Sequence, residues 1–295
     1  MAVDVDPKTL EIGAAAAAHA QRQAIVHIGE EINARDPSDL SALVGSLAPE
    51  GPYAYTIMPT IREDGTVSLP VLTTIDEIAE AYAFIRGLSH LHEVVGLTEV
   101  AGAWYLFQDS LTIGGAFGTD ERNQRQTLGL FPSGGETGIT GELVWLRVPP
   151  DRLGGPDDPH VWTGDELQDR KRVYDRFDRH LDGLRENDID ALLEPIHDGA
   201  ASAIRNYVAG TGALIELTGT ADHRSWYQDL LDAYEVRALQ VLHRITDTWY
   251  TFAELRVTAL ERASGRVVSF HTAEFHVAAK DGRFIARVGH GTEPV

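Results

Sequence analysis

The residues best suited to chemistry are carboxylates and histidines within apolar segments. Glu254 and Asp109 each lie among aromatic and aliphatic neighbours, where shielding from water would raise a carboxyl pKa and let the group act as an acid or a base. His243 lies on the strand predicted before Glu254, and the strand after it carries His271 and Glu274, either of which could be the third member of the group. Three adjacent antiparallel strands would then bring together a base and the carboxylate that orients it.

Glu254 could instead lie outside such a shielded site, as strand alternation shows. Phe252, Glu254 and Arg256 share one face of the strand, and Ala253 and Leu255 share the other. The second face is the more apolar. If that face fills the interior of the domain, Glu254 lies on the opposite sheet face as an interface residue paired with Arg256. The sequence leaves both placements open.

Hydrogen-bond donors and apolar surface complete this candidate site. Arg205 and Tyr207 lie two apart on a predicted strand, so they share a face and could donate to an oxyanion or pair with surface acids. Tyr174, near the apolar stripe of a helix, is a third candidate donor or a core residue. Large aromatic residues offer area to a ligand or to the core: they are Trp226, Trp249 and Phe252. The first half offers Tyr53, Tyr55, His90, His92 and Asp109.

Several kinds of cofactor site are not indicated. The chain has no cysteine, which excludes disulfides, thiolate catalysis and sulfur-ligated zinc. His271 and His276 have opposite strand parity, so the sequence predicts no metal site. The segment Ser133-Gly134-Gly135 lacks the Gly-Lys-Ser/Thr ending of a phosphate loop. We therefore expect no cofactor.

Composition limits the partners. Of 295 residues, 43% are hydrophobic and 24% charged, the balance of a folded chain. The net charge of −20 would repel nucleic acid and anionic membranes. No window approaches the ~18 consecutive apolar residues of a membrane span, and Asp4 and Asp6 stand where a secretory signal carries basic residues. We expect a cytoplasmic protein.

The chain repeats itself at long range. The segment 104–109 (WYLFQD) recurs as 249–254 (WYTFAE), an offset of 145 (249 − 104). Ala81-Tyr82 falls on Trp226-Tyr227 at the same offset, and 39–43 (DLSAL) resembles 188–192 (DIDAL). Three collinear matches indicate a duplicated domain, with residues 149–159 as the linker. The predicted domains are 15–150 and 165–295.

Both halves have the same predicted order of elements. In the second half, apolar residues recur every three or four positions in a helix over 170–186: they are Val173, Phe177, Leu181 and Leu184. A short helix follows at 190–195, then strands at 201–207 and 214–217, and a helix at 222–234. Long strands end the half, at 236–246, 249–261, 266–279 and 283–288. The first half matches, with helices at 15–34, 38–47 and 75–85, then strands from residue 92 onward.

This order, with the DIDAL helix and the terminal 281–285 (DGRFI) hairpin, resembles the SnoaL-like and ketosteroid-isomerase-like superfamily, also called nuclear-transport-factor-like. The resemblance implies two tandem cone-shaped α+β barrels of the cystatin-like fold, each a curved antiparallel sheet wrapped on a long helix. It implies a site inside the cone. Members dimerise through their sheets, so the tandem chain resembles a fused pseudo-dimer, which further self-association could extend.

The leading hypothesis is a cofactor-independent enzyme that moves protons within a small, largely apolar molecule of aromatic, steroid or terpenoid type. An isomerase, lyase, dehydratase or epoxide hydrolase would fit. We expect the site in the second domain, with Glu254 or a histidine as base and the more divergent, Gly-rich first domain as structural partner. The alternative is a non-catalytic binding or assembly module with both cones filled by side chains.

Overall fold

The chain folds into two compact units. The computed structural model describes residues 7–34, 36–134, 136–149, 162–205 and 212–295, with side chains from residue 13 onward. One unit comprises Met1–Ile57 and Leu72–His160, and the other Met58–Val71 and Val161–Val295. The sequence division placed residues 58–71 in the first domain, whereas they group with the second unit. The predicted linker, from residue 150 on, lies outside the described residues.

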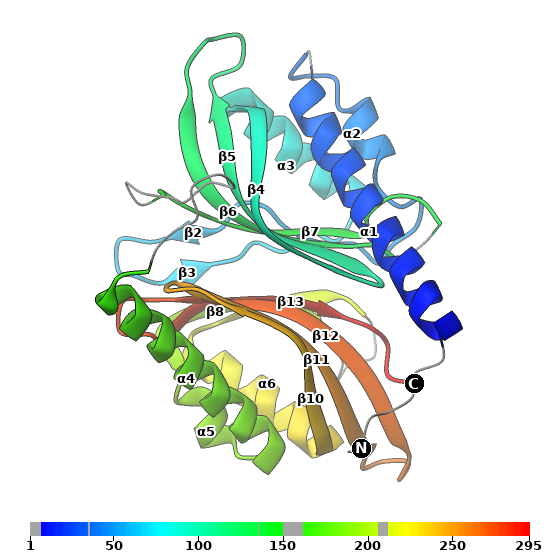
Figure 1. The fold of residues 1–295 in the computed structure, drawn as a ribbon, viewed down its shortest axis with the longest axis vertical. Coiled ribbons are helices and arrows are strands. Elements are labelled where there is room, and N and C mark those ends of the chain that lie inside the picture. The colour runs from blue at the N-terminus through cyan, green and yellow to red at the C-terminus, as the bar shows by residue number, and fades with distance from the viewer. Residues whose placement is uncertain (1–6, 35, 135, 150–161, 206–211) are drawn as a thin grey trace. The chain divides into compact units, whose positions relative to one another are not determined.

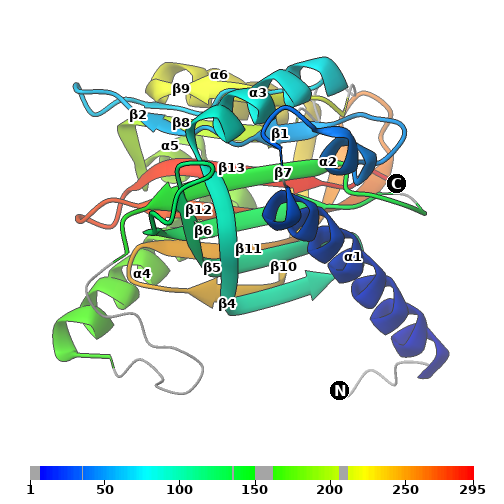
Figure 2. The same ribbon diagram turned by 90° about the horizontal axis from the view of Figure 1, so that it is seen from above.

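The first unit is a five-stranded sheet with three helices (Figure 1). Its sheet order is β1-β7-β6-β5-β4, antiparallel except for the parallel pair β1/β7. Helix α1 packs across β4 and β5 (Figure 2). The helices are α1 (Pro7–Asn33), α2 (Ser41–Gly45) and α3 (Ile75–Leu88), and the strands β1 (Ala54–Thr56), β4 (His90–Gly102), β5 (Tyr105–Gly115), β6 (Asn123–Pro132) and β7 (Gly141–Arg147).

The second unit repeats this topology with one more strand. Its order is β10-β11-β12-β13-β8-β9, and β8 pairs with β13 in parallel as β1 does with β7. All three helices lie on one face of its curved sheet (Figure 1). The helices are α4 (Gly164–Glu186), α5 (Ile189–Leu193) and α6 (Gly219–Ala233), and the strands β8 (Ile196–Arg205), β9 (Leu214–Thr218), β10 (Tyr234–Thr246), β11 (Tyr250–Glu261), β12 (Val267–Ala278) and β13 (Phe284–Gly291).

The segment Met58–Val71, which groups with the second unit, forms a small hairpin of β2 (Thr60–Ile61) and β3 (Val67–Ser68). Strand β3 lies against β8 and β9. One Glu216 carboxylate oxygen accepts hydrogen bonds from the Leu69 backbone N–H (2.6 Å) and from the Ser68 hydroxyl (3.0 Å). These bonds join the hairpin to the second unit.

Two β-bulges confirm the predicted duplication. The β4/β5 ladder shifts register between Leu91 and Glu93 and again between Gly96 and Thr98. The β10/β11 ladder shifts between Val236 and Ala238 and between Val241 and His243. Each shift recurs at the offset of 145 seen in the aromatic repeat (236 − 91, 241 − 96). Bulges disrupt local pairing, so two at matched places indicate one ancestral sheet geometry.

Helix ends and packing follow local chemistry. Helices α3 and α4 both begin with a capping box, in which Thr74 pairs with Glu77 and Thr163 with Glu166. The apolar stripe predicted for α4 is buried and packs on Ala253 and other residues of the sheet. The predicted α+β fold class, with a curved sheet on a long helix in each half, is therefore confirmed. In the described part of the chain, no helix is long and apolar enough to span a membrane.

Candidate functional site

The predicted residues around Glu254 do meet, on the sheet face turned away from α4. Ala253 and Leu255 pack with the α4 stripe, so Glu254 between them points to the opposite face. Its carboxylate lies 3.3 Å from His271 Nδ1 and 3.8 Å from His243 Nε2. This arrangement is the second placement that strand alternation allowed. It puts the cluster outside the interior of the cone.

The structure does not bring the other second-half candidates together into one pocket. Tyr174 is half-exposed, with the Arg244 guanidinium carbon 3.6 Å from its ring centre. Arg205 donates hydrogen bonds to the Gly291 carbonyl and to Glu293. Tyr207 lies outside the described residues. The three aromatic candidates are buried, Trp226 within the main core of its unit: they are Trp226, Trp249 and Phe252.

The first-half candidates have separate places. The Tyr53 hydroxyl donates to the Ala48 carbonyl (2.7 Å), and His90 Nε2 lies 3.2 Å from the Ile32 carbonyl oxygen. The His90 and His92 rings stack edge to face, with centres 4.9 Å apart. Asp109 accepts two bonds from Gln126. Tyr55 is fully buried, and its hydroxyl has no hydrogen-bond partner among the described residues.

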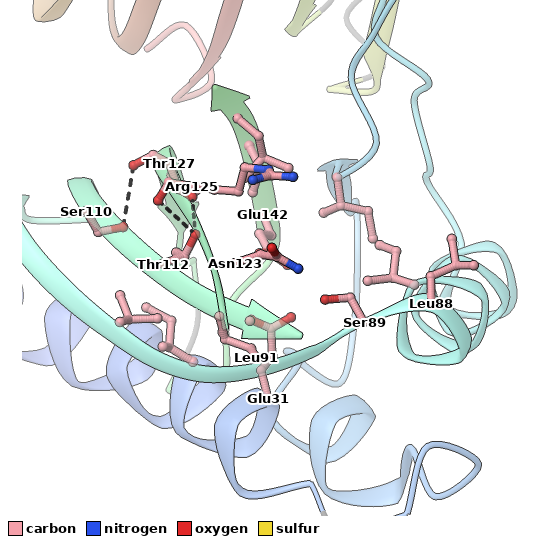
Figure 3. Close-up of a pocket in the computed structure, with 18 of the residues that line it drawn as sticks. Glu31, Leu88, Ser89, Leu91, Ser110, Thr112, Asn123, Arg125, Thr127 and Glu142 are labelled. Atoms are coloured by element: carbon pink, nitrogen blue, oxygen red, sulfur yellow. Dashed lines mark hydrogen bonds between the residues drawn. The ribbon is translucent and has the colours of Figure 1, made fainter. Parts of the chain in front are cut away.

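A cavity of about 600 Å³ lies within the first unit, between its helices and its sheet. The sequence predicts a site in the second half instead. Figure 3 shows Ser110, Thr112 and Thr127 on the sheet side and Leu88 and Ser89 on the helix side. Aliphatic side chains supply much of the remaining wall: they are Ile28, Ile57, Ile85, Leu91, Val94, Val144 and Leu146.

The cavity runs from an exposed rim to a buried end. Rim residues such as Leu88, Asn123 and Arg125 are exposed, whereas Tyr82 and Glu142 at the other end are buried. A volume of this size is within the range of small-molecule sites. The polar groups at the buried end are therefore reachable through an otherwise largely apolar chamber.

Smaller or more polar side chains explain why this interior is open. In the sheet, Ser110 and Gly129 occupy the positions that Leu255 and Glu274 take in the second unit, at the offset of 145. On the long helices the offset is 153 (186 − 33, from the helix ends). Glu31, which faces the cavity, thus matches a buried leucine of α4, Leu184. At these matched places the second unit carries larger side chains than the first.

The buried end of the cavity holds a histidine, a tyrosine and a glutamate. His27 Nε2 lies 2.9 Å from the Tyr82 hydroxyl, which donates a short hydrogen bond to Glu142 Oε2. His27 Nε2 is 3.4 Å from the same carboxylate oxygen. Tyr82 and Glu142 line the cavity, and His27 lies behind them, fully buried. Burial, with the Glu142 charge adding to it, raises the pKa of Tyr82 well above its usual value.

A second carboxyl faces the same end of the cavity. Glu31 lies on α1, one turn beyond His27, and it lines the chamber together with Glu142 (Figure 3). Burial raises the pKa of Glu31 well above its ordinary range, and the Glu142 charge raises it further against the opposing effect of Arg86. The raised pKa lets Glu31 keep its proton to higher pH than an ordinary glutamate does, beside an ionisable neighbour, an arrangement suited to acid–base chemistry.

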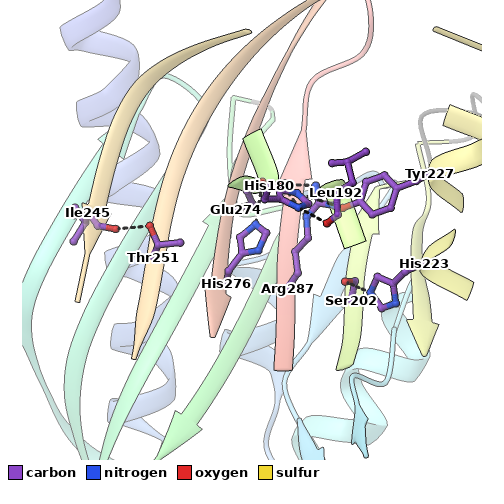
Figure 4. Close-up of polar contacts among 10 residues, drawn as sticks. All are labelled: His180, Leu192, Ser202, His223, Tyr227, Ile245, Thr251, Glu274, His276 and Arg287. Atoms are coloured by element: carbon purple, nitrogen blue, oxygen red, sulfur yellow. Dashed lines mark hydrogen bonds and ion pairs between the residues drawn. The ribbon is translucent and has the colours of Figure 1, made fainter. Parts of the chain in front are cut away.

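The matched place in the second unit carries the opposite charge. Arg287, at the position of Glu142, donates to the Tyr227 hydroxyl (2.7 Å) and to Glu274 Oε2 (2.6 Å) (Figure 4). Burial disfavours the Glu274 carboxylate, but Arg287 and a hydrogen bond from His276 outweigh it and lower the pKa of Glu274 far below normal. Burial, with neighbouring positive charge, lowers the pKa of His180 to about 3. This interior is a closed, neutralised network.

Two groups of side chains have the spacing of metal ligands. The donor atoms of His27, Glu31 and Glu142 lie within 4.8 Å of one another, as do those of His180, Glu274 and His276. In the first group the Tyr82 hydroxyl bridges His27 Nε2 and Glu142 Oε2, where an ion would bind. In the second group the carboxylate is already bound by a guanidinium. Both geometries fit proton sharing or ion pairing better than metal coordination.

Sequence reasoning missed the cavity residues. Tyr82 was noticed only as half of a repeated dipeptide, and Glu142 stands alone in an apolar strand. His27, Tyr82 and Glu142 are separated by 55 and 60 residues. One signal was present: each long helix carries a histidine at the same distance from its end, His27 before Asn33 and His180 before Glu186.

The comparisons with known proteins give a likeness of fold. No protein-family model matches the chain, and no curated protein matches it. The epoxide hydrolase/cyclase-like enzyme SalBIII, described as having a role in pyran ring formation in the polyether salinomycin, matches with 16% identity, covering 42% of this chain and 94% of its own, at a TM-score of 0.36.

Two further solved structures are similar to the chain. A ketosteroid isomerase-like protein from Erwinia carotovora atroseptica SCRI1043 is 13% identical, and the match covers 43% of this chain and 98% of that one at a TM-score of 0.35. An NTF-2 like protein of unknown function from Burkholderia xenovorans LB400 is 12% identical over 43% and 88%, at a TM-score of 0.33.

Proposed function

We propose that the cavity of the first unit is the active site of a cofactor-independent enzyme that moves protons within a small, largely apolar molecule. One observation carries the proposal. Two carboxyl groups, Glu31 and Glu142, line the same end of an accessible chamber of about 600 Å³ whose wall combines aliphatic and polar side chains. Water exclusion strengthens acid and base groups in such a site.

The two carboxyls have different roles. Glu142 lines the cavity and accepts a hydrogen bond from Tyr82, so its carboxylate is placed to serve as the base that removes a proton from a substrate carbon. Glu31, whose pKa is raised, serves as the acid that delivers a proton elsewhere on the substrate. In an isomerisation the two transfers balance, and in a dehydration the delivered proton leaves with the hydroxyl as water. Proton return from Glu142 to Glu31 completes the cycle.

The base is testable without knowing the natural substrate. Ring opening of a nitrobenzisoxazole needs only removal of a carbon-bound proton, and the molecule is small enough for the chamber. We expect the protein to accelerate this reaction and Glu142→Gln to lower the rate by about 100-fold or more. The matched control is Asp109→Asn, because Asp109 is a buried carboxylate on β5 that does not line the cavity. Equal rates in wild type and Glu142→Gln would contradict the proposal.

The acid is tested by pH. A raised pKa keeps Glu31 protonated over a wider range, so a reaction that needs its proton should slow as pH rises through that raised pKa. Glu31→Gln should abolish this decline of the rate at high pH. Nitrobenzisoxazole opening does not need Glu31 to deliver a proton to carbon, so its rate should stay largely unchanged. A screen of hydroxylated apolar compounds for loss of water supplies the acid-dependent reaction.

A further inference from the structure

A chain of hydrogen bonds runs from the backbone to the cavity in the first unit. The Ser46 hydroxyl lies 2.6 Å from the Leu43 carbonyl oxygen and 2.7 Å from His27 Nδ1. His27 Nε2 lies 2.9 Å from the Tyr82 hydroxyl, which makes the short bond to Glu142. Ser46, His27 and Tyr82 are all buried. Water is therefore excluded from the interior of the chain.

The number of protons in this chain is decisive. A carbonyl at one end and a carboxylate at the other can only accept, so the four hydrogen bonds need four protons. Ser46 and Tyr82 carry one each, and a neutral His27 carries one on either ring nitrogen. With Glu142 ionised the chain is one proton short for both histidine tautomers. Two buried acceptors would then face each other without a hydrogen, which is unfavourable.

The second unit has a comparable chain of hydrogen bonds with no deficit, in which the histidine bonds a backbone carbonyl directly, without a hydroxyl between them (Figure 4). His180 Nδ1 lies 3.1 Å from the Leu192 carbonyl oxygen, and its Nε2 lies 3.4 Å from the Tyr227 hydroxyl. The far end is Arg287, a permanent donor to that hydroxyl. Neutral His180, Tyr227 and Arg287 supply every proton that the chain needs. The two chains thus differ by one donor, at the position of Glu142.

We propose that the chain of His27, Tyr82 and Glu142 holds one additional proton, and that His27 is the positioning residue that stores it behind the cavity. In one arrangement His27 is an imidazolium and Glu142 a carboxylate. In the other, His27 is neutral and Glu142 a carboxylic acid. They interconvert when Nε2 gives its proton to the Tyr82 oxygen as Tyr82 gives its own to Glu142 Oε2. Charge and proton number are unchanged.

Titratable and charged groups from three elements surround this chain of hydrogen bonds. Glu31 of α1 faces Glu142, and the Tyr55 hydroxyl of β1 interacts with both carboxyls. The cation that interacts with Glu31 is Arg86 of α3, whose guanidinium donates to the Asp39 carbonyl (2.6 Å). The consequence for catalysis rests on the proposed function: Glu142 can take a proton or give one without exchange with solvent.

The stored proton is measured directly in the resting full-length protein. Nitrogen NMR of isotope-labelled histidine reports the protonation of both ring nitrogens, and His180 is an internal control expected to be neutral. Infrared difference spectra between wild type and Glu142→Gln report a protonated Glu142 carboxyl. We expect one additional proton at neutral pH, seen as a doubly protonated His27, a protonated Glu142 or a mixture. In Glu142→Gln the amide donates to Tyr82, so His27 should become neutral.

One result overturns the inference: a neutral His27 together with a fully ionised Glu142 in wild type. Failure of the proposed function is separate, because the proton can be present while nitrobenzisoxazole opening is absent. His27→Gln tests the positioning role. Loss of the stored proton should move the rate–pH profile of that reaction, since His27 then no longer holds the proton that Glu142 exchanges. Structural damage would lower the rate without moving the profile, and His180→Gln should leave the profile unchanged.

Discussion

Both units have a histidine and a tyrosine at matched positions in a chain of buried hydrogen bonds. The residue at the end of that hydrogen-bond chain is acidic in the first unit and basic in the second. In the first unit the third member is Glu142, at the end of an open cavity, and in the second it is Arg287, which also binds Glu274. A glutamate leaves the chain one proton short, while an arginine completes it. At this one position the first unit carries a glutamate beside a cavity, and the second carries an arginine bound to Glu274. Duplication allows this division, because one copy supplies stability while the other keeps a cavity.

Volume separates the units as clearly as charge. Gly129 in the first cavity matches Glu274, and Ala24 on α1, one turn before Ile28, matches Phe177 on α4. Phe177 packs edge to face on His276, with ring centres 5.1 Å apart. Large side chains therefore fill the second interior from both the helix and the sheet.

The largest expected effect comes from giving the first unit the residue of the second. Glu142→Arg should lower the rate of nitrobenzisoxazole opening by about 1,000-fold, because the base is replaced by a permanent cation. The fold should persist, since Arg donates to Tyr82 as Arg287 does to Tyr227. Steady-state rates of the two proteins, with circular dichroism as a check on folding, test this. A rate within threefold of wild type would show that the base lies elsewhere.

The reverse change opens the filled interior. Phe177→Ala should lower the free energy of unfolding by about 3–5 kcal/mol, the usual range for removing a buried phenylalanine. A filling change in the first unit is Ser110→Leu, which introduces the residue found at the matched position 255 and should reduce nitrobenzisoxazole binding while leaving stability within about 1.5 kcal/mol. Chemical denaturation measures both. If Phe177→Ala is harmless, the second interior is not the rigid, packed one described.

How far the sequence could predict this molecule depends on the distance between the residues involved. The aromatic repeat at 104–109 and 249–254 was local and predicted the tandem fold, and strand parity limited Glu254 to two placements. The volume left inside each unit depends on how Gly129 or Glu274 packs against helices that are distant in the sequence. A local sequence pattern therefore could not predict which interior is open. No local sequence pattern indicated that residues 58–71 belong to the second unit.

The buried ion pair of the second unit should appear in its acid stability. The pKa of Glu274 is lowered in the folded state, so its contribution is complete above the unfolded pKa of about 4.3 and is lost as pH falls below it. Glu274→Gln should cost about 2 kcal/mol at neutral pH and flatten the decline in acid. Denaturation at several pH values tests this. Parallel decline in both proteins would mean that other carboxylates dominate.

The smallest expected effect compares the helix caps of the two units. Thr74 caps α3 and Thr163 caps α4 in the same geometry, each accepting a 3.3 Å bond from the backbone N–H three residues on. Thr74→Ala and Thr163→Ala should each cost about 1 kcal/mol, since each leaves one backbone donor without its side-chain partner. Because α3 supplies Tyr82 and α4 supplies His180, only the first variant should also slow nitrobenzisoxazole opening, through fraying toward Tyr82. Equal rates in both variants would show that a single capping bond does not govern the order of the site.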